Sequence, residues 1–156
     1  QVTVNHKDHG MQLAQLNIAQ VKYDLDAPQM KDFVDNLDIV NATAEDNPGF
    51  VWRLKDDSGS ATNIQAFDDS NMLVNMSIWR DVDSLKDFMF RTHHKDFMRR
   101  KGEWFHKLPQ ANYVMWWIEE NHRPTIEEAL ERLEHLREHG ESAYAFSFKK
   151  VFNKLN

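Results

Sequence analysis

The eight residues from Met72 to Trp79 alternate between two kinds of side chain. Asn75, Ser77 and Trp79 fall on one side of this alternation, and Met, Val and Ile residues fall on the other. Because successive side chains of a strand point to opposite faces of a sheet, the pattern predicts a strand with one apolar face and one mixed face. A strand of this kind, followed directly by a helix, is well suited to form one wall of a small-molecule pocket.

Strand-like and helix-like patterns follow one another along the chain in an order that limits the fold. Strands are predicted over residues 13–23, 50–55, 72–79 and 112–118, and helices over residues 30–44 and 81–108. The resulting β-α-β-β-α-β order is that of the ferredoxin-like arrangement, an α+β fold in which two helices cover one face of an antiparallel sheet. A third helix is predicted between Pro124 and Gly140, and a last extended segment over residues 143–152.

The length of the chain indicates one domain, since 156 residues with 41% apolar content are enough for a single core. We expect that domain over residues 11–156, preceded by an N-terminal extension over residues 1–10 that is either disordered or left by cloning. Trp52, Trp79 and either Trp116 or Trp117 make the second face of the sheet too apolar for contact with water. We therefore expect two copies to pair their sheets in a homodimer.

Composition excludes several classes of function. The formal charge of −6 argues against nucleic-acid partners, because such binding rests on phosphate neutralisation by clustered Lys and Arg. The chain has no cysteine, which excludes disulfides, thiolate catalysis and cysteine-ligated metal sites. No apolar run approaches the roughly 18 residues of a membrane span, so we expect no membrane partner and a cytoplasmic location.

Several short runs resemble the bacterial family of unknown function DUF3291. They are Pro48-Gly-Phe-Val-Trp-Arg53, Val74-Asn-Met-Ser-Ile-Trp79, Trp104-Phe105, Trp116-Trp117 and His122-Arg-Pro124. The resemblance covers residues 11–152 and leaves the first ten residues outside. That family is grouped with the dimeric α+β barrels, whose relatives include antibiotic-biosynthesis monooxygenases, haem-degrading enzymes, chlorite dismutases and aldoxime dehydratases. The resemblance therefore implies a dimeric α+β barrel fold, and it transfers no single reaction.

Two adjacent histidines, His93 and His94, lie on the predicted helix over residues 81–108. At about 100° per residue, His93 shares the inward arc with Phe97, and His94 lies at the margin of that arc. The resemblance instead implies that the pocket histidine is His94. We predict His94 as a general acid or base, or alternatively as the axial ligand of a haem, and one of the two histidines as structural.

The mixed faces of the predicted strands supply the other candidate site residues. Asn17 and Asn75 are predicted to orient a substrate or to stabilise a developing negative charge on it, because a buried amide needs a hydrogen-bonding partner. The alternative is that these amides only pair with one another across the sheet. The remaining predicted substrate-binding residues are Ser77, Trp79, Trp117, Arg53, Trp52, His93 and Phe97.

These features predict a small-molecule enzyme with a hydrophobic pocket, monooxygenase-like, acting on an aromatic or polyketide-like compound. One alternative is a haem-binding enzyme, with the helix histidine as the iron ligand and no other metal site. The other alternative is a binding or sensing protein that holds a small hydrophobic molecule without converting it. The sequence leaves the cofactor open between haem and none.

Overall fold

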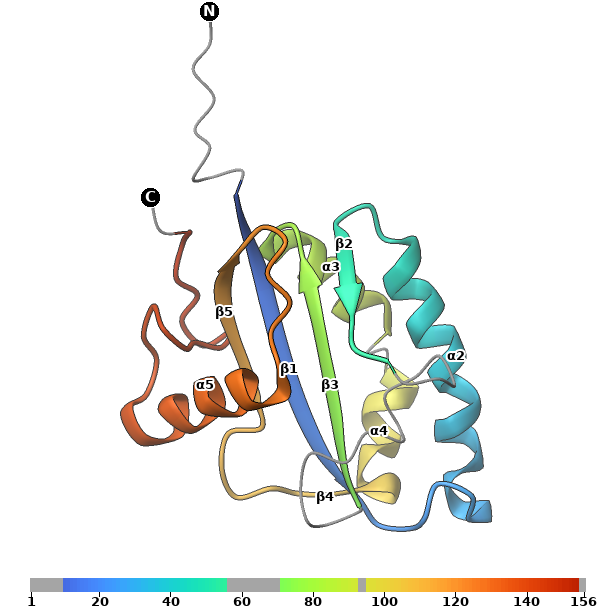
Figure 1. Cartoon of the computed structure of the whole chain (residues 1–156). Helices are drawn as coiled ribbons and strands as arrows, with labels where there is room; N and C mark the ends of the chain where they lie inside the picture. Colours follow the sequence, from blue (N-terminus) through green and yellow to red (C-terminus); the bar gives the residue numbers. More distant parts are fainter. Residues whose placement is uncertain (1–9, 56–70, 93–94, 155–156) are drawn as a thin grey trace, which may run out of the picture.

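A computed structural model describes residues 10–55, 71–92 and 95–154 of the chain (Figure 1). Its central strand is β1 (Met11–Val21), which pairs antiparallel with β3 (Met72–Trp79) on one side and with β5 (Tyr113–Glu119) on the other. The short strand β2 (Phe50–Arg53) pairs antiparallel with β3. The spatial order β5-β1-β3-β2 is that of a ferredoxin-like sheet, which confirms the predicted α+β fold.

A two-residue strand, β4 (Phe105–His106), lies beside the far end of β1. It pairs with Gln20 and Val21, on the same side of β1 as β5. Within the helix predicted over residues 81–108, the structure describes α3 (Val82–Thr92) and α4 (Lys95–Trp104). The predicted end at residue 108 is wrong: α4 ends at Trp104, because Phe105 pairs with the sheet instead of continuing the helix.

Three helices cover the mixed face of the sheet, which carries the odd-numbered residues of β1 and β3. They are α3, α4 and α2 (Lys31–Asp46), the last preceded by the 3-10 turn η1 (Pro28–Met30). Figure 1 shows α3 and α4 behind the sheet and α2 along the β2 side. Met30, Phe33 and Trp104 form a buried cluster with Val21, so packing of aromatic rings holds α2 and α4 against the end of β1.

The opposite face of the sheet is covered by α5 (Ile126–His139), which lies in front of it in Figure 1. The Thr125 hydroxyl accepts a hydrogen bond from Glu128 N at 3.1 Å, and Gly140 ends the helix with φ 79°, as the sequence predicts. Leu133 and Leu136 pack in one buried cluster with the apolar residues of β1, β3 and β5.

The sequence predicts a homodimer because one apolar face of the sheet would otherwise contact water. That face is covered by α5, so this physical reason does not hold. Trp116 and Ile78 on this face have 0% of their surface exposed in a single chain, so no second copy is needed to shield them. Trp79 is also 0% exposed, and it lies on the mixed face, which α2, α3 and α4 cover. A homodimer stays a prediction that rests on the family resemblance.

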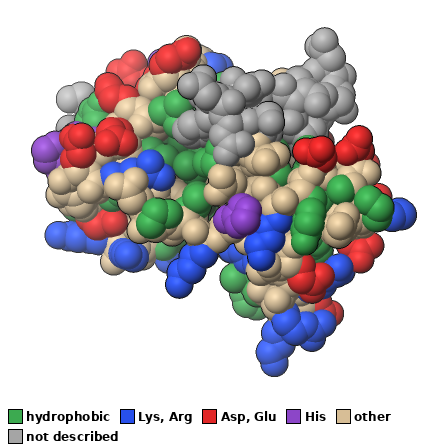
Figure 2. All heavy atoms as spheres, turned by 90° about the horizontal axis from the view of Figure 1, so that it is seen from below, with side chains coloured by type: hydrophobic (Ala, Val, Ile, Leu, Met, Phe, Trp, Pro, Cys, Tyr) green, Lys and Arg blue, Asp and Glu red, His purple; other side chains and the backbone are tan. Residues whose placement is uncertain are grey.

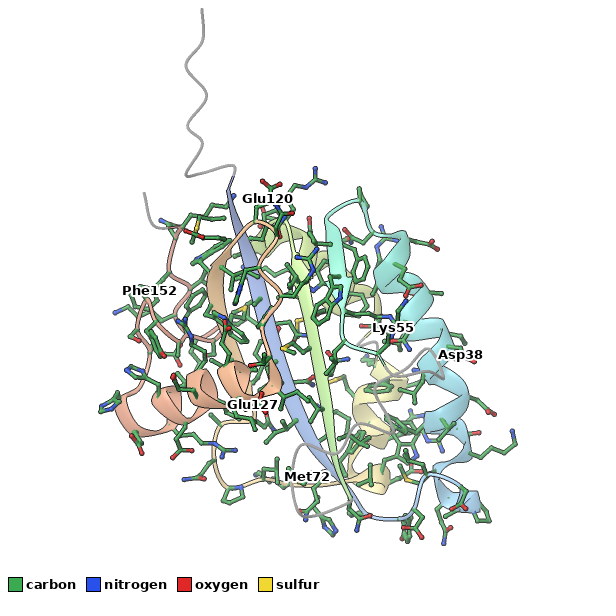
Figure 3. The ribbon with its side chains drawn as sticks, in the orientation of Figure 1. Asp38, Lys55, Met72, Glu120, Glu127 and Phe152 are labelled. Carbon is green, nitrogen blue, oxygen red and sulfur yellow. The ribbon has the colours of Figure 1, made fainter. Side chains whose placement is uncertain are left out.

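The segment after α5 runs back beside β5 and covers the end of the mixed face. Its residues pair with β5 at one bridge, Met115 with Phe146, and do not form a full strand. The indole Nε1 of Trp117 donates a 2.8 Å hydrogen bond to the carbonyl of Phe152, which is labelled in Figure 3. Within the described ranges, no helix is long and apolar enough to cross a membrane.

Candidate functional site

A cavity of about 910 Å³ lies between the mixed face of β1 and β3 and the helices α2, α3 and α4. This volume falls in the range of small-molecule sites, about 300 to 1,000 Å³. Most of its walls are apolar, with Phe33, Leu37, Leu73, Phe97 and Phe105 among the lining side chains. The aromatic rings of α2 and α4 therefore face the sheet across a space large enough for a flat ligand.

Polar side chains converge on this cavity because of the register of β1 and β3. Asn17 lies opposite Asn75, and Gln15 lies opposite Ser77. Directly opposite residues of an antiparallel pair point to the same face, so all four side chains lie on the cavity side of the sheet. The alternation of polar and apolar residues in the sequence therefore correctly predicts that these four polar side chains share one face of the sheet.

A short hydrogen-bond network fixes these side chains. Gln15 Nε2 donates to Asn75 Oδ1 at 2.8 Å and to Ser77 Oγ at 2.6 Å. The indole Nε1 of Trp79 donates to the same Ser77 oxygen at 2.8 Å. Because Gln15 occupies its carbonyl oxygen, Asn75 presents its N–H groups as the polar atoms available to a ligand.

Asn17 presents a hydrogen-bond acceptor to the cavity, whereas Asn75 presents donors. Its Oδ1 is buried and accepts no hydrogen bond within the described part of the chain. An acceptor buried in this way costs about 1 to 3 kcal/mol unless a partner satisfies it. The cavity therefore offers an unsatisfied acceptor on β1 next to amide donors on β3, a pair that matches a ligand hydroxyl beside a carbonyl or an oxyanion.

Tyr113 completes this end of the cavity from β5, where it is the strand partner of Asn17. Its hydroxyl lies 3.6 Å from the sulfur of Met89, which is a weak acceptor. Burial raises the pKa of the Tyr113 phenol well above its usual range, since an apolar environment disfavours the charged form. Tyr113 is therefore a neutral hydroxyl at physiological pH.

The predicted site residues divide into distinct groups. Asn17, Asn75, Arg53 and Phe97 line the cavity. The Arg53 guanidinium pairs with Glu45 of α2, with 2.8 Å between Nε and Oε2, so it joins β2 to the helix layer. His93 and His94 lie outside the described residues, and their predicted roles stay predictions.

Ser77 and Trp79 lie behind the cavity wall and do not line it. Ser77 is 5% exposed and acts as the acceptor that holds Gln15. The Trp79 ring is stacked on Phe88, with 5.0 Å between ring centroids, and meets Phe50 edge-on at 5.5 Å. Phe88 is the ring that lines the cavity, so Trp79 supports the wall from the core.

The placement of Trp52 and Trp117 differs from the sequence prediction. Trp52 packs with the α5 side of the sheet, where the Arg123 guanidinium lies 5.9 Å from its ring centroid. Trp117 points to the mixed face, but the C-terminal segment covers it near Phe152. Neither tryptophan lines the cavity. Trp52 lies on the side of α5 and Trp117 contacts the C-terminal segment, and both of these elements follow the ferredoxin-like core in the chain.

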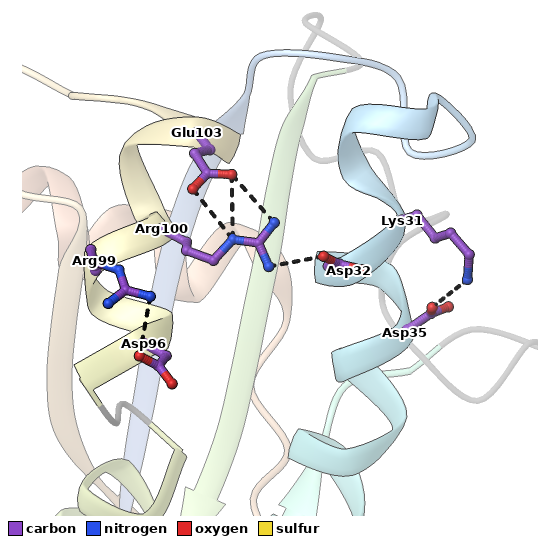
Figure 4. A network of polar contacts seen from close by, with 7 residues as sticks. All are labelled: Lys31, Asp32, Asp35, Asp96, Arg99, Arg100 and Glu103. Atoms are coloured by element: carbon purple, nitrogen blue, oxygen red, sulfur yellow. Dashed lines mark hydrogen bonds and ion pairs between the residues drawn. The ribbon is translucent and has the colours of Figure 1, made fainter.

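An ion-pair network ties the two helices that close the cavity (Figure 4). Arg100 of α4 pairs with Asp32 of α2 at 2.9 Å and with Glu103 one turn further along α4 at 3.3 Å. These carboxylates raise the pKa of Arg100 by hydrogen bonding. The guanidinium also lies over the Trp104 ring, 4.8 Å from its centroid, so the same side chain links α2, α4 and the aromatic cluster.

Part of the cavity lining lies beside β4, at the end of the molecule that Figure 2 shows from below, and is exposed to solvent. In that view hydrophobic side chains come to the surface beside Lys, Arg and a His. The lining residues at this end include Lys101, His106 and Lys107. Reasoning from the sequence missed these three and Tyr113, because periodicity identifies the face of an element but not which faces enclose a space.

The family model that matches this chain is the "Domain of unknown function (DUF3291)", over residues 12–156. The chain belongs to this family. None of the curated proteins matches the DUF3291 chain at a significant level.

Several solved structures are similar to this DUF3291 protein at low sequence identity. A conserved protein from Methanosarcina mazei Go1 is 13% identical with a TM-score of 0.48, covering 76% of this chain and 100% of its own. The N63A mutant of SnoaB, a cofactor-independent oxygenase from Streptomyces nogalater, is 17% identical with a TM-score of 0.40, covering 73% of this chain and 95% of its own. PA3566 from Pseudomonas aeruginosa is 13% identical with a TM-score of 0.42, covering 75% and 98%. These likenesses are too distant to carry an activity over.

The described lining of the DUF3291 cavity does not by itself fit a haem. Its one histidine is His106, which is exposed at the surface end, whereas an axial ligand has to face the buried porphyrin. No group of three or more His, Asp or Glu residues that could hold a metal ion occurs among the residues the structure describes.

Proposed function

We propose that this DUF3291 protein is a small-molecule enzyme that binds a flat hydrophobic compound in its cavity and oxidises it in a monooxygenase-like reaction. The observation that supports this most is the pair of amides, Asn17 and Asn75, facing each other on the wall of a largely apolar cavity of ligand size. The Oδ1 atom of Asn17 is buried without a partner, which is expensive, and a bound ligand is the partner this cavity can supply.

The amides suggest how an aromatic substrate is held. A substrate hydroxyl donates to the unsatisfied Asn17 Oδ1, and the Asn75 N–H groups donate to a neighbouring carbonyl or phenolate oxygen. Fixed donors stabilise negative charge that develops on a bound substrate. Deprotonation of an electron-rich aromatic is thereby favoured, and such an anion is the form most readily attacked by O₂.

The proton has to be removed by a group other than those described at this end of the cavity. Tyr113 and Arg53 are the ionisable described residues nearest the amides along the strands; burial raises the pKa of the Tyr113 phenol, and a guanidinium has no hydrogen-bond acceptor to take up a proton. His94 is our candidate base, because its predicted position follows α3. Without an effective base the same cavity serves a binding or sensing protein, which is the second candidate function.

Oxygen uptake with a panel of phenolic and hydroxyquinone aromatics tests the proposal. We expect turnover by the wild type, a loss of about 10² to 10³ in kcat/KM for Asn75→Ala, and no change beyond about twofold for Asn153→Ala. Asn153 is an exposed amide on the C-terminal segment and serves as the matched control. Saturable binding without oxygen uptake would favour the binding protein.

The same assay distinguishes the predicted roles of His93 and His94. If His94 is the base, His94→Ala loses turnover while binding is retained, and His93→Ala keeps both. Unchanged turnover of every accepted substrate in His94→Ala would remove the acid–base role.

A further inference from the structure

The surface end of the cavity is cationic in a protein whose formal charge is −6. Lys101 on α4, His106 on β4 and Lys107 directly after it line this end and are exposed to solvent on their outer sides. Among the described residues none of these three forms an ion pair within 4 Å, whereas Arg53, which lines the cavity, and Arg100 of α4 are each paired with a carboxylate. The cationic end therefore has charge that the described chain does not neutralise.

The cationic end and the amides lie at different points along β1. His106 pairs with Gln20 of β1, three residues beyond Asn17. At about 3.3 Å per residue this separates the two ends by about 10 Å along the strand. Lys101 lies one helical turn after Phe97, on the face of α4 that lines the cavity.

The wall between the two ends is apolar. Leu73, Phe97 and Phe105 line it, and Met98, 47% exposed, carries the apolar surface outward on α4. A ligand that satisfies all three regions has a polar group for the amides, a hydrophobic body about 10 Å long and an anionic group at the mouth. Opposite charges at such a mouth also raise the local concentration of the ligand.

We propose that Lys101 and Lys107, with His106 beside them, select ligands that carry an anionic group, such as an aromatic carboxylate or sulfonate. The hydrophobic body lies between Leu73 and Phe97, and the anion faces the lysines at the surface. This inference rests on the proposed function, because it takes the cavity as the ligand site.

Two fluorescent probes with the same skeleton test this selection. 8-Anilinonaphthalene-1-sulfonate and N-phenyl-1-naphthylamine differ in the sulfonate, so their affinities isolate the contribution of the negative charge. The variant Lys101→Gln/Lys107→Gln is compared with Lys149→Gln/Lys150→Gln, which changes the charge equally on the exposed C-terminal segment. Circular dichroism establishes that each variant is folded.

We expect Lys101→Gln/Lys107→Gln to weaken binding of the sulfonate probe by about 3- to 20-fold and that of the neutral probe by less than about twofold. Added salt should weaken sulfonate binding to the wild type and have little effect on the variant. Equal affinities of the wild type and the Lys101→Gln/Lys107→Gln variant for the sulfonate probe would overturn the inference while leaving the cavity as a ligand site. Failure of the wild type to bind either probe would overturn the inference and the proposed function together.

Discussion

Gln15 Nε2 donates a 2.6 Å hydrogen bond to Ser77 Oγ across the β1–β3 ladder, beneath the floor of the cavity. The same nitrogen donates a second hydrogen bond, to Asn75 Oδ1, at 2.8 Å. The orientation of the Asn75 amide is therefore set by a residue on the neighbouring strand, before any ligand is present. This preorganisation is what a group that stabilises developing charge requires.

Removal of the Ser77 hydroxyl should destabilise the fold through its two donors. Ser77→Ala leaves Gln15 Nε2 and Trp79 Nε1 without their shared acceptor, and we expect the free energy of unfolding to fall by about 1 to 3 kcal/mol. Urea denaturation measures the change. Thr43→Ala is the control, because it removes a hydroxyl that only bonds the carbonyl of Ile39 within α2, and it should stay within about 0.5 kcal/mol.

The turn between α2 and β2 needs a glycine at position 49. A Cβ on Gly49 would overlap the Ser84 side chain at the start of α3. We expect Gly49→Ala to lower the free energy of unfolding by about 1 to 3 kcal/mol, and Ser84→Gly in the same chain to recover part of the loss. Gly102→Ala is the matched control: a Cβ there meets nothing within 4 Å, and alanine in the interior of α4 should stabilise the protein by about 0.5 to 1 kcal/mol.

Half-buried Tyr113, on the cavity wall, should make stability depend on pH in the alkaline range. Its folded-state pKa is raised by burial, whereas the unfolded chain loses the phenol proton near pH 10. The folded state then holds more protons than the unfolded state, so the free energy of unfolding falls as pH rises above about 10, and the effect is absent well below it.

The matching variant is Tyr113→Phe. Between pH 9 and pH 11 the wild type should lose about 1.4 kcal/mol more than Tyr113→Phe in urea denaturation. Tyr23→Phe, at a tyrosine that is 39% exposed, should follow the wild type. Identical pH profiles of the wild type and Tyr113→Phe would show that the phenol at position 113 ionises normally in the folded protein.

The haem alternative has a direct spectroscopic check. We expect no Soret band in the purified protein and no sharpened, ligation-shifted Soret band after addition of hemin, because the described lining offers only His106, at the exposed end of the cavity. A band that persists in His93→Ala and disappears in His94→Ala would contradict this and identify His94 as the iron ligand.

The sequence predicts the sheet well, for a physical reason. A strand has a side-chain period of two, so the alternation that groups Asn75 with Ser77 also sets the face on which they lie, and the observed register places Asn17 and Gln15 opposite them. The capping pattern of Thr125 and Gly140 likewise predicts the bounds of α5 closely, since it reports on local hydrogen bonding.

The sequence predicts less where the outcome depends on contacts between distant elements. Phe105 has the spacing of a helical core residue, yet it pairs with Val21 in the sheet. The apolar residues along one side of α5 do not indicate which surface of the protein the helix covers. The burial of Trp116 within a single chain could therefore not be predicted. Lys101 has the residue type of a solvated surface, and only the enclosed space beside it shows that it lines a site.

The most direct test of the central claim is to fill the cavity and measure ligand binding. Ala19→Phe places a ring in the lining from β1, and Ala42→Phe places the same ring on the exposed side of α2. Titration with N-phenyl-1-naphthylamine should show affinity reduced by about tenfold or more in Ala19→Phe and changed by less than about twofold in Ala42→Phe, with both variants folded by circular dichroism. Wild-type affinity in a folded Ala19→Phe protein would contradict the claim that the space between the sheet and helices α2, α3 and α4 is the ligand site.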